Sequence, residues 1–149
     1  MRLVIQRVKQ ARVSADGKVC GEVGPGIVVF VGIGKEDRPE TCAEMADRTI
    51  FLRIFNDAVG KMNFSLLESG GAALVVSQFT LYGDVRRGRR PGFDRAAPPQ
   101  EARVLYERYV ECLRSRGVHV ETGEFQAHMQ VELVNDGPVT ILMDSEKLF

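Results

Sequence analysis

The segment "SQFTL" at positions 77–81 places polar side chains at the end of an apolar run that is typical of a strand. Ser77, Gln78 and Thr80 supply two hydroxyls and one amide, with Phe79 between them. Thr80 is a candidate nucleophile only if a general base lies beside it, and the pattern identifies no such partner. The N–H groups where the strand ends are a second candidate, because main-chain donors can hold a developing oxyanion. The pattern alone favours a plainer interpretation, in which the strand leaves the core and turns polar.

A second unusual segment, "NDGPVT" at positions 135–140, lies between two runs that alternate apolar and polar residues. Asn135 and Asp136 before Gly137 are typical of a tight hairpin, so the sequence predicts a hairpin here. Pro138 is not explained by a hairpin, because it removes a backbone donor where the next strand should begin. X-Pro bonds adopt the cis form at an appreciable rate, and a cis Gly137-Pro138 bond would turn backbone carbonyls outward. Physical chemistry permits that arrangement without selecting it.

Arginines gather in one segment without periodicity, residues 84–98, which is predicted to be a loop. Guanidinium groups suit phosphates, and an otherwise neutral chain must bind a polyanion through such a local cluster. A solvated loop explains the same charges equally well, so composition leaves both interpretations open. The cluster consists of Arg86, Arg87, Arg89, Arg90 and Arg95.

The remaining composition excludes several classes of function. Twenty basic residues balance twenty acidic ones, so no overall field attracts nucleic acid or membrane. The three cysteines are far apart and the two histidines are not spaced as a metal pair, so we expect neither a metal nor a cofactor. Phosphate-binding, serine-hydrolase and zinc-protease motifs are absent. His128 is expected on the polar face of a strand, as a surface residue.

The N-terminus does not have the pattern of a signal peptide, and the longest apolar run is too short to cross a bilayer. We therefore expect a cytoplasmic protein with reduced, buried thiols.

The hydrophobic pattern predicts one domain, residues 1–149, with an α+β fold. Many antiparallel strands favour a β-barrel-like sheet with two helices packed outside. The expected helices span 38–55 and 98–117, the first beginning near Asp37. A hairpin is expected around Asp16-Gly17. The expected strands cover residues 3–8, 26–34, 62–67, 72–81, 118–122, 128–134 and 139–144.

Five segments occur together and in this order: "KMNFSLL", "VVSQFTLYGD", "RRGRRPGFDRAAPP", "LYERYV" and "MQVELVNDGPVT". With them the chain resembles the D-aminoacyl-tRNA deacylase family over essentially its full length. It implies a homodimeric, cytoplasmic, cofactor-free esterase with a β-barrel-like fold. Such an enzyme releases D-amino acids from the 3′ end of mischarged tRNA, and also glycine mischarged on alanine tRNA.

The resemblance also assigns roles to residues. Gly137-Pro138 becomes a cis pair that enters the partner's site, where its carbonyls exclude L-amino acids. Arg7 is expected to hold the partner's Gly-Pro turn, and Asn135 and Thr140 complete the motif. Ser77, Gln78, Phe79 and Thr80 are expected around the ester and the adenosine. We favour catalysis by the N–H groups of Phe79 and Thr80, with the 2′-hydroxyl of the terminal adenosine helping to activate water.

Where the family pattern reads "GxFGAxM", this chain reads "GEFQAHM", with Gln126 and His128 as departures. The adenosine contacts are therefore expected to differ here. Two alternatives remain from the residues themselves. One is a non-catalytic RNA-binding module with the arginine loop as its binding surface; in the deacylase, Arg86, Arg87, Arg89 and Arg90 are expected to bind the tRNA. The other is a structural or partner-binding dimer.

Overall fold

One long strand, β1, organises the sheet in the computed structural model, which describes residues 1–149. It pairs antiparallel with three strands: β3 along its first half, β2 along its second half and β8 along nearly its full length. Asp16 and Gly17 form the turn into β2 with φ angles of 49° and 75°, so the predicted hairpin is confirmed. The strands are β1 (Arg2–Ala15), β2 (Lys18–Val23), β3 (Gly26–Gly32) and β8 (Met129–Asp144).

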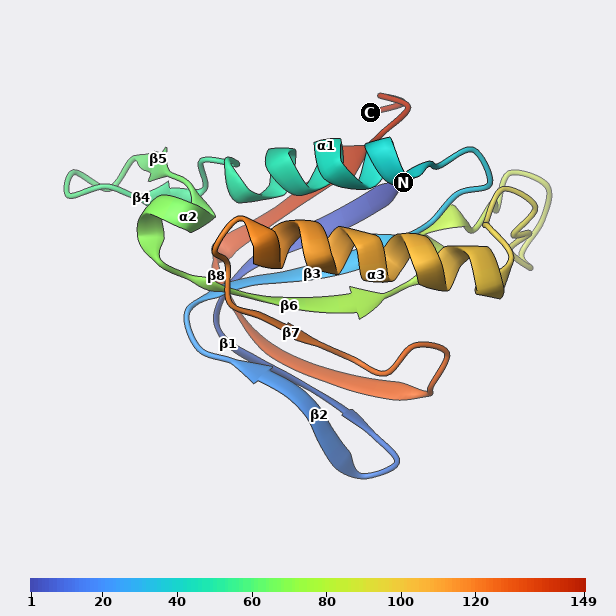
Figure 1. The fold of residues 1–149 in the computed structure, drawn as a ribbon, viewed down its shortest axis with the longest axis horizontal. Coiled ribbons are helices and arrows are strands. Elements are labelled where there is room, and N and C mark those ends of the chain that lie inside the picture. The colour runs from blue at the N-terminus through green and yellow to red at the C-terminus, as the bar shows by residue number, and fades with distance from the viewer.

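Two parallel pairings extend the sheet beyond β3. β6 (Ala72–Ser77) pairs with β3, and β7 (Val120–Thr122) pairs with β6. The strand order is β2-β1-β3-β6-β7, with β8 on the free side of β1, and the sheet curls into a nearly closed barrel (Figure 1). The predicted α+β class is therefore confirmed, as a mixed sheet rich in antiparallel pairs. A small separate hairpin, β4 (Phe55–Asn56) and β5 (Met62–Phe64), lies outside it.

The central strands are apolar throughout because both faces of the sheet are covered. Val29 and Val31 of β3 face a large core shared with the helices, whereas Val28 faces a smaller core inside the curled sheet. In β6, Val75 faces the first core, and Leu74 faces the second. The run "GIVVFVG" is therefore one strand between two cores.

The two long helices, α1 (Pro39–Ile50) and α3 (Pro99–Ser115), lie side by side over one face of the sheet (Figure 1). Each begins with proline at its first position, where the missing N–H removes no helical bond. One stripe of α3 faces the core: Leu105 is partly buried, and the buried residues are Ala102, Tyr106, Tyr109, Cys112 and Leu113. Neither helix is long and apolar enough to cross a membrane.

The ends of some elements differ from the prediction. α1 ends at Ile50, and Asp37 does not cap it but accepts a hydrogen bond from the Gly34 N–H at 2.7 Å. The predicted strand 62–67 ends at Phe64, because Ser65 starts a third, one-turn helix, α2 (Leu66–Ser69). Ser65 Oγ accepts from the Glu68 N–H, and the Glu68 carboxylate accepts from the Ser65 N–H. The Ser-x-x-Glu spacing of this capping box is visible in the sequence.

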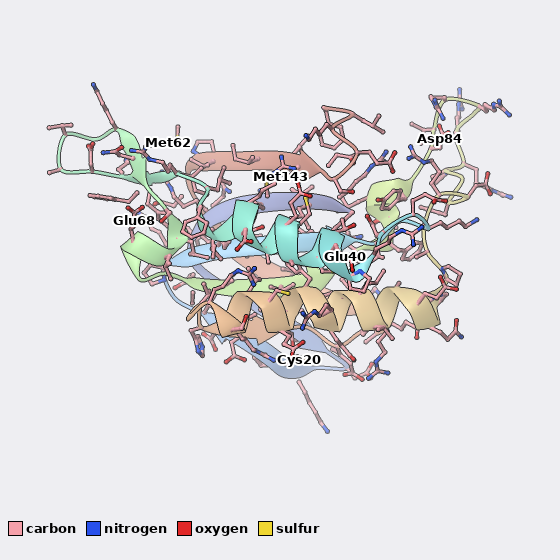
Figure 2. The ribbon with its side chains drawn as sticks, turned by 45° about the horizontal axis from the view of Figure 1, so that its top comes forward. Cys20, Glu40, Met62, Glu68, Asp84 and Met143 are labelled. Atoms are coloured by element: carbon pink, nitrogen blue, oxygen red, sulfur yellow. The ribbon has the colours of Figure 1, made fainter.

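The expectation of buried thiols holds for Cys42 and Cys112 only, since Cys20 is exposed on β2. Figure 2 shows the extended shape of the molecule, with Asp84 at one end and Met62 and Glu68 at the other.

All three tyrosines are buried, and burial raises the pKa of each hydroxyl. Because the folded state holds these protons more tightly, their contribution to stability is complete below pH ~10 and is lost as the pH rises further. We expect no tyrosinate absorbance from the folded chain until alkaline unfolding, when Tyr82, Tyr106 and Tyr109 ionise together. The control is the urea-unfolded chain, which should titrate near pH ~10. A hydroxyl that titrates normally in the folded chain would contradict this prediction.

Candidate active site

A pocket of about 610 Å³ opens where β6 ends, between that strand, the start of α3 and the segment that leads into β8. Its size lies within the range of small-molecule sites. Most of the wall is apolar, with Phe79, Phe93 and Phe125 among the lining residues. The polar lining groups belong to Ser77, Gln78, Tyr106, Gln126 and His128.

The segment "SQFTL" turns at the edge of this pocket and does not continue as a strand. β6 ends at Ser77, the Gln78 N–H makes a last bond to the Val31 carbonyl at 2.7 Å, and Phe79–Tyr82 forms a 3₁₀ turn. The predicted strand over 72–81 is therefore too long by its last four residues. The missed turn matters, because the first N–H groups of any helical turn have no acceptor within it. Those of Phe79 and Thr80 donate to no other part of the chain.

The side chains of this segment do not form a nucleophile with its base. The Thr80 hydroxyl is hydrogen-bonded to the amide of Gln78, and Thr80 does not line the pocket. Ser77 and Gln78 line it, as does Phe79, whose side chain is 59% exposed. The structure contains no cluster of His, Cys, Asp and Glu that could hold a metal ion. Two adjacent free N–H groups beside an apolar pocket are suited to binding an oxyanion.

The segment "NDGPVT" does not form a hairpin, which corrects the prediction. β8 continues through it, and Asn135 and Thr140 are both paired with β1, opposite Val8 and Gln6. Residues 136–139 are opposed by Arg7 alone, so they leave the ladder as an excursion from one strand. The predicted cis form of the Gly137-Pro138 bond is confirmed.

Side chains close this excursion at its base. The Asn135 amide donates to the Val139 carbonyl at 3.2 Å and accepts from the Val139 N–H at 3.1 Å. The Thr140 hydroxyl accepts from the Gln6 amide at 3.1 Å. The local alternation was correctly predicted on both sides of the segment. The hairpin was wrong because β1 is long enough to pair with both halves.

Arg7 lies beneath this excursion, with only 7% of its surface exposed. Its Nε donates to the Asp136 carbonyl at 3.1 Å, and its Nη1 donates to the Ile54 carbonyl and, at 3.2 Å, to Asn56 Oδ1. Nη2 lies 2.9 Å from where a Cβ on Gly137 would be. Arg7 therefore contacts the turn of its own chain, and its expected contact with the partner's turn stays a prediction. No periodicity pointed to Ile54 and Asn56.

The Gly-Pro excursion does not reach its own chain's pocket. Arg7 is paired with Ile27 of β3, whereas Ser77 is paired with Val31 of that strand. The two sites are therefore separated by four residues along β3, ~13 Å, and also by the strands between them. Neither Gly137 nor Pro138 lines the pocket.

The arginine loop borders the pocket. Phe93 of the loop packs edge-on against Phe79 with 5.0 Å between the ring centroids, and both rings line the pocket. Two of the five arginines are paired, Arg86 with Asp84 and Arg95 with Glu146. The other three form no ion pair and are exposed: Arg87, Arg89 and Arg90.

The segment that departs from the family pattern forms the opposite wall. His128 is exposed, as predicted, yet it lines the pocket. Gln126 lines it too, with a φ of +66°. Sequence reasoning missed Phe93, Tyr106 and Phe125 as lining residues, because they come from separate segments that only the fold brings together.

Fold and pocket together define a barrel-like α+β protein with main-chain donors at the edge of an apolar site. A family model described as D-Tyr-tRNA(Tyr) deacylase matches residues 4–144, and the chain belongs to this family. A Symbiobacterium thermophilum protein named D-aminoacyl-tRNA deacylase is 62% identical over 149 residues, 100% of this chain and 99% of that protein. A Thermotoga petrophila protein of the same name is 58% identical over 100% of both chains. These curated relatives are enzymes.

Solved structures share the fold. A protein titled "c-Myc DNA Unwinding Element Binding Protein" superposes with a TM-score of 0.91 at 38% identity, covering 97% of this chain and 98% of that one. A probable eukaryotic D-amino acid tRNA deacylase superposes with a TM-score of 0.85 at 19% identity, covering 95% and 97%. At that lower identity the second likeness supports the fold alone.

Proposed function

We propose that this chain hydrolyses the ester that joins a D-amino acid to the 3′ end of tRNA, releasing the D-amino acid and free tRNA. Family membership supports this activity. The single structural observation that carries it is the pair of free N–H groups at Phe79 and Thr80 beside an apolar pocket. Glycine mischarged on alanine tRNA is included as a substrate.

The proposed chemistry uses no side-chain nucleophile. Water attacks the ester carbonyl, and the two N–H groups hold the oxyanion as negative charge develops. The 2′-hydroxyl of the terminal adenosine helps to activate the water. Ser77, Gln78 and the ring of Phe79 surround the ester and the adenosine. The bond to the 3′ oxygen then breaks, and that oxygen takes a proton as the tRNA leaves.

Rejection of L-amino acids is proposed to come from a second copy of the chain. Enantiomers carry the same groups in different directions, so a rigid obstacle in one direction separates them. The carbonyls of Gly137 and Pro138 are proposed to form that obstacle in the partner's pocket. The ~13 Å offset from their own pocket and their exposed position support this arrangement. Glycine passes because it has no side chain.

The rest of the tRNA is proposed to lie along the arginine loop. Arg87, Arg89 and Arg90 are free to contact phosphates, whereas Arg86 would have to exchange its bond with Asp84. The homodimer would act in the cytoplasm, where aminoacylated tRNA is used.

The deciding experiment incubates the purified protein with D-tyrosyl-tRNA and L-tyrosyl-tRNA in parallel. Release from the D form alone supports the proposal. Equal release from both would refute the chiral obstacle. Retention of tRNA without any release would support the alternative, a non-catalytic nucleic-acid-binding module. That alternative draws on the free arginines and on the DNA-binding title of one structural relative.

Replacing Thr80 by alanine tests the assignment of catalysis to the main chain. Because the hydroxyl points to Gln78 and not into the pocket, Thr80→Ala should retain kcat within about tenfold of the native value. The measurement is single-turnover deacylation of D-tyrosyl-tRNA, with Ser77→Ala as a comparison inside the pocket. An acyl-enzyme trapped on Thr80 would overturn the assignment.

A further inference from the structure

Gln126 is the one pocket residue with a left-handed backbone and a side chain other than hydrogen. Its φ is +66°, and the other non-glycine residues with positive φ, Asp16 and Lys147, lie outside the pocket. Such a conformation disfavours residues with a Cβ, and it persists where the surroundings hold it. The backbone here is held on both sides of Gln126.

The bonds that hold the turn are well defined. The Gly123 N–H donates to the Val75 carbonyl at 3.1 Å, and the Ala127 N–H donates to the Glu124 carbonyl at 3.3 Å. Phe125 packs against Tyr106 with 5.7 Å between ring centroids. The Tyr106 hydroxyl donates to the same Val75 carbonyl at 2.8 Å. The turn is thus anchored to β6 and α3, and this fixes where the Gln126 side chain leaves the backbone.

The Gln126 amide, in contrast, makes no hydrogen bond within the chain. The other amide in the pocket, on Gln78, is bonded to Thr80. Gln126 therefore presents the free amide of the pocket, with its acceptor and donor side by side in one plane. The two ring nitrogens of His128 point in different directions, so they do not offer such a pair.

We propose that the Gln126 amide recognises the adenine base at the 3′ end of the tRNA. An amide pairs with adenine through two parallel bonds, accepting from the 6-amino group and donating to a neighbouring ring nitrogen. The apolar wall, with Phe125 and Phe93, suits the faces of the base. The inference rests on the proposed function and adds to it a contact that selects the terminal base.

The test combines a substrate change with a residue change. The substrates are the D-tyrosyl ester of adenosine and that of purine riboside, which lacks the 6-amino group. With the native chain, loss of the amino group should lower kcat/KM about fivefold, because KM rises while kcat stays the same. With Gln126→Ala the two esters should be cleaved equally well. If this variant discriminates between them as the native chain does, the inference is wrong.

Replacing Gln126 by glycine removes the side-chain amide and also relieves the left-handed backbone, so a matched control must separate the two effects. This variant should lose the discrimination while its melting temperature stays level or rises. Asp16→Gly relieves the same kind of backbone outside the pocket and should keep the fivefold discrimination. If the native chain cleaves none of the three substrates, the two esters and D-tyrosyl-tRNA, both the proposed function and this inference are refuted. Cleavage of both esters at one rate by the native chain would refute the inference alone.

Discussion

Replacing Gly137 by alanine should lower the preference for D-tyrosyl-tRNA over L-tyrosyl-tRNA about a hundredfold, because the L form is then cleaved. The φ of Gly137 is +130°, which a residue with a Cβ rarely adopts. An added Cβ would lie 2.8 Å from Val139 Cγ2 and 2.9 Å from Arg7 Nη2, so the excursion must shift. Under the proposed function, a shift on the order of 1 Å misplaces the obstacle, and misplacement of that size is worth about a hundredfold.

The matched control is Gly117→Ala, after α3. Gly117 also has a positive φ, +87°, but an added Cβ would meet nothing within 4 Å. This variant should lose some stability and keep the native ratio of D to L cleavage. The proposal for the excursion would be wrong if Gly137→Ala, folded and dimeric by sedimentation, showed native rates on both substrates.

Replacing Arg7 by alanine should reduce both stability and selectivity. The guanidinium satisfies the Ile54 carbonyl, the Asn56 side chain and the Asp136 carbonyl from a nearly buried position. Its loss leaves buried acceptors without donors, so we expect the free energy of unfolding to fall by about 3 kcal/mol. The ion pair with Asp136 adds little to this figure, because that carboxylate is 39% exposed. Urea unfolding and the ratio of D to L cleavage are the measurements.

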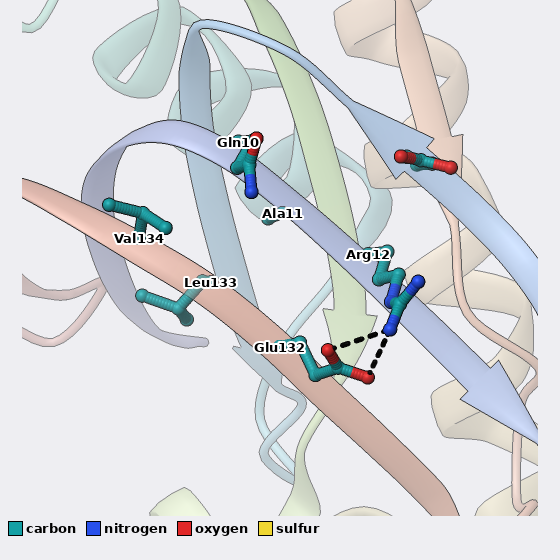
Figure 3. A pocket seen from close by; sticks show the side chains of 7 residues that line it. Gln10, Ala11, Arg12, Glu132, Leu133 and Val134 are labelled. Carbon is teal, nitrogen blue, oxygen red and sulfur yellow. Dashed lines mark hydrogen bonds and ion pairs between the residues drawn. The ribbon is translucent and has the colours of Figure 1, made fainter.

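Arg12 provides the matched control on the same strand. It donates two hydrogen bonds to the Glu132 carboxylate across β1 and β8, at 3.0 and 2.9 Å, but both side chains are exposed in the wall of a second pocket (Figure 3). Arg12→Ala should therefore change the urea midpoint little and leave selectivity unaltered. Equal destabilisation by the two variants would show that burial of Arg7 has no special importance.

The sequence predicted most of the elements because their apolar periodicity is local. The stripe of α3 and the alternation of β1 each follow from residues close together in the chain, as does the turn at Asp16-Gly17. The errors arose where a distant partner decides the outcome. Alternation around Gly137 suits a hairpin and a continuous strand alike, and only the length of β1 selects the strand. The predicted strand over 72–81 was too long because β6 ends where its pairing with β3 ends, and no local pattern in the sequence marks that point.

The candidate site was predictable only in part, for the same reason. The resemblance picked out Ser77 to Thr80 and the Gly-Pro pair, but the free N–H groups exist because of a turn that periodicity did not indicate. The contacts of Arg7 with Ile54 and Asn56 join segments 47 and 49 residues apart. Local patterns in the sequence do not indicate contacts between residues so far apart in the chain.

β8 gives this architecture a property that neither site has alone. Met129 and Val131 of this strand line the pocket of their own chain, and Gly137 lies further along the same backbone. Between them the strand is held to β1 by its hydrogen bonds. If two chains assemble as proposed, each β8 touches its own substrate at one end and its neighbour's substrate at the other. Both substrate sites of the dimer would then depend on the position of the same strand.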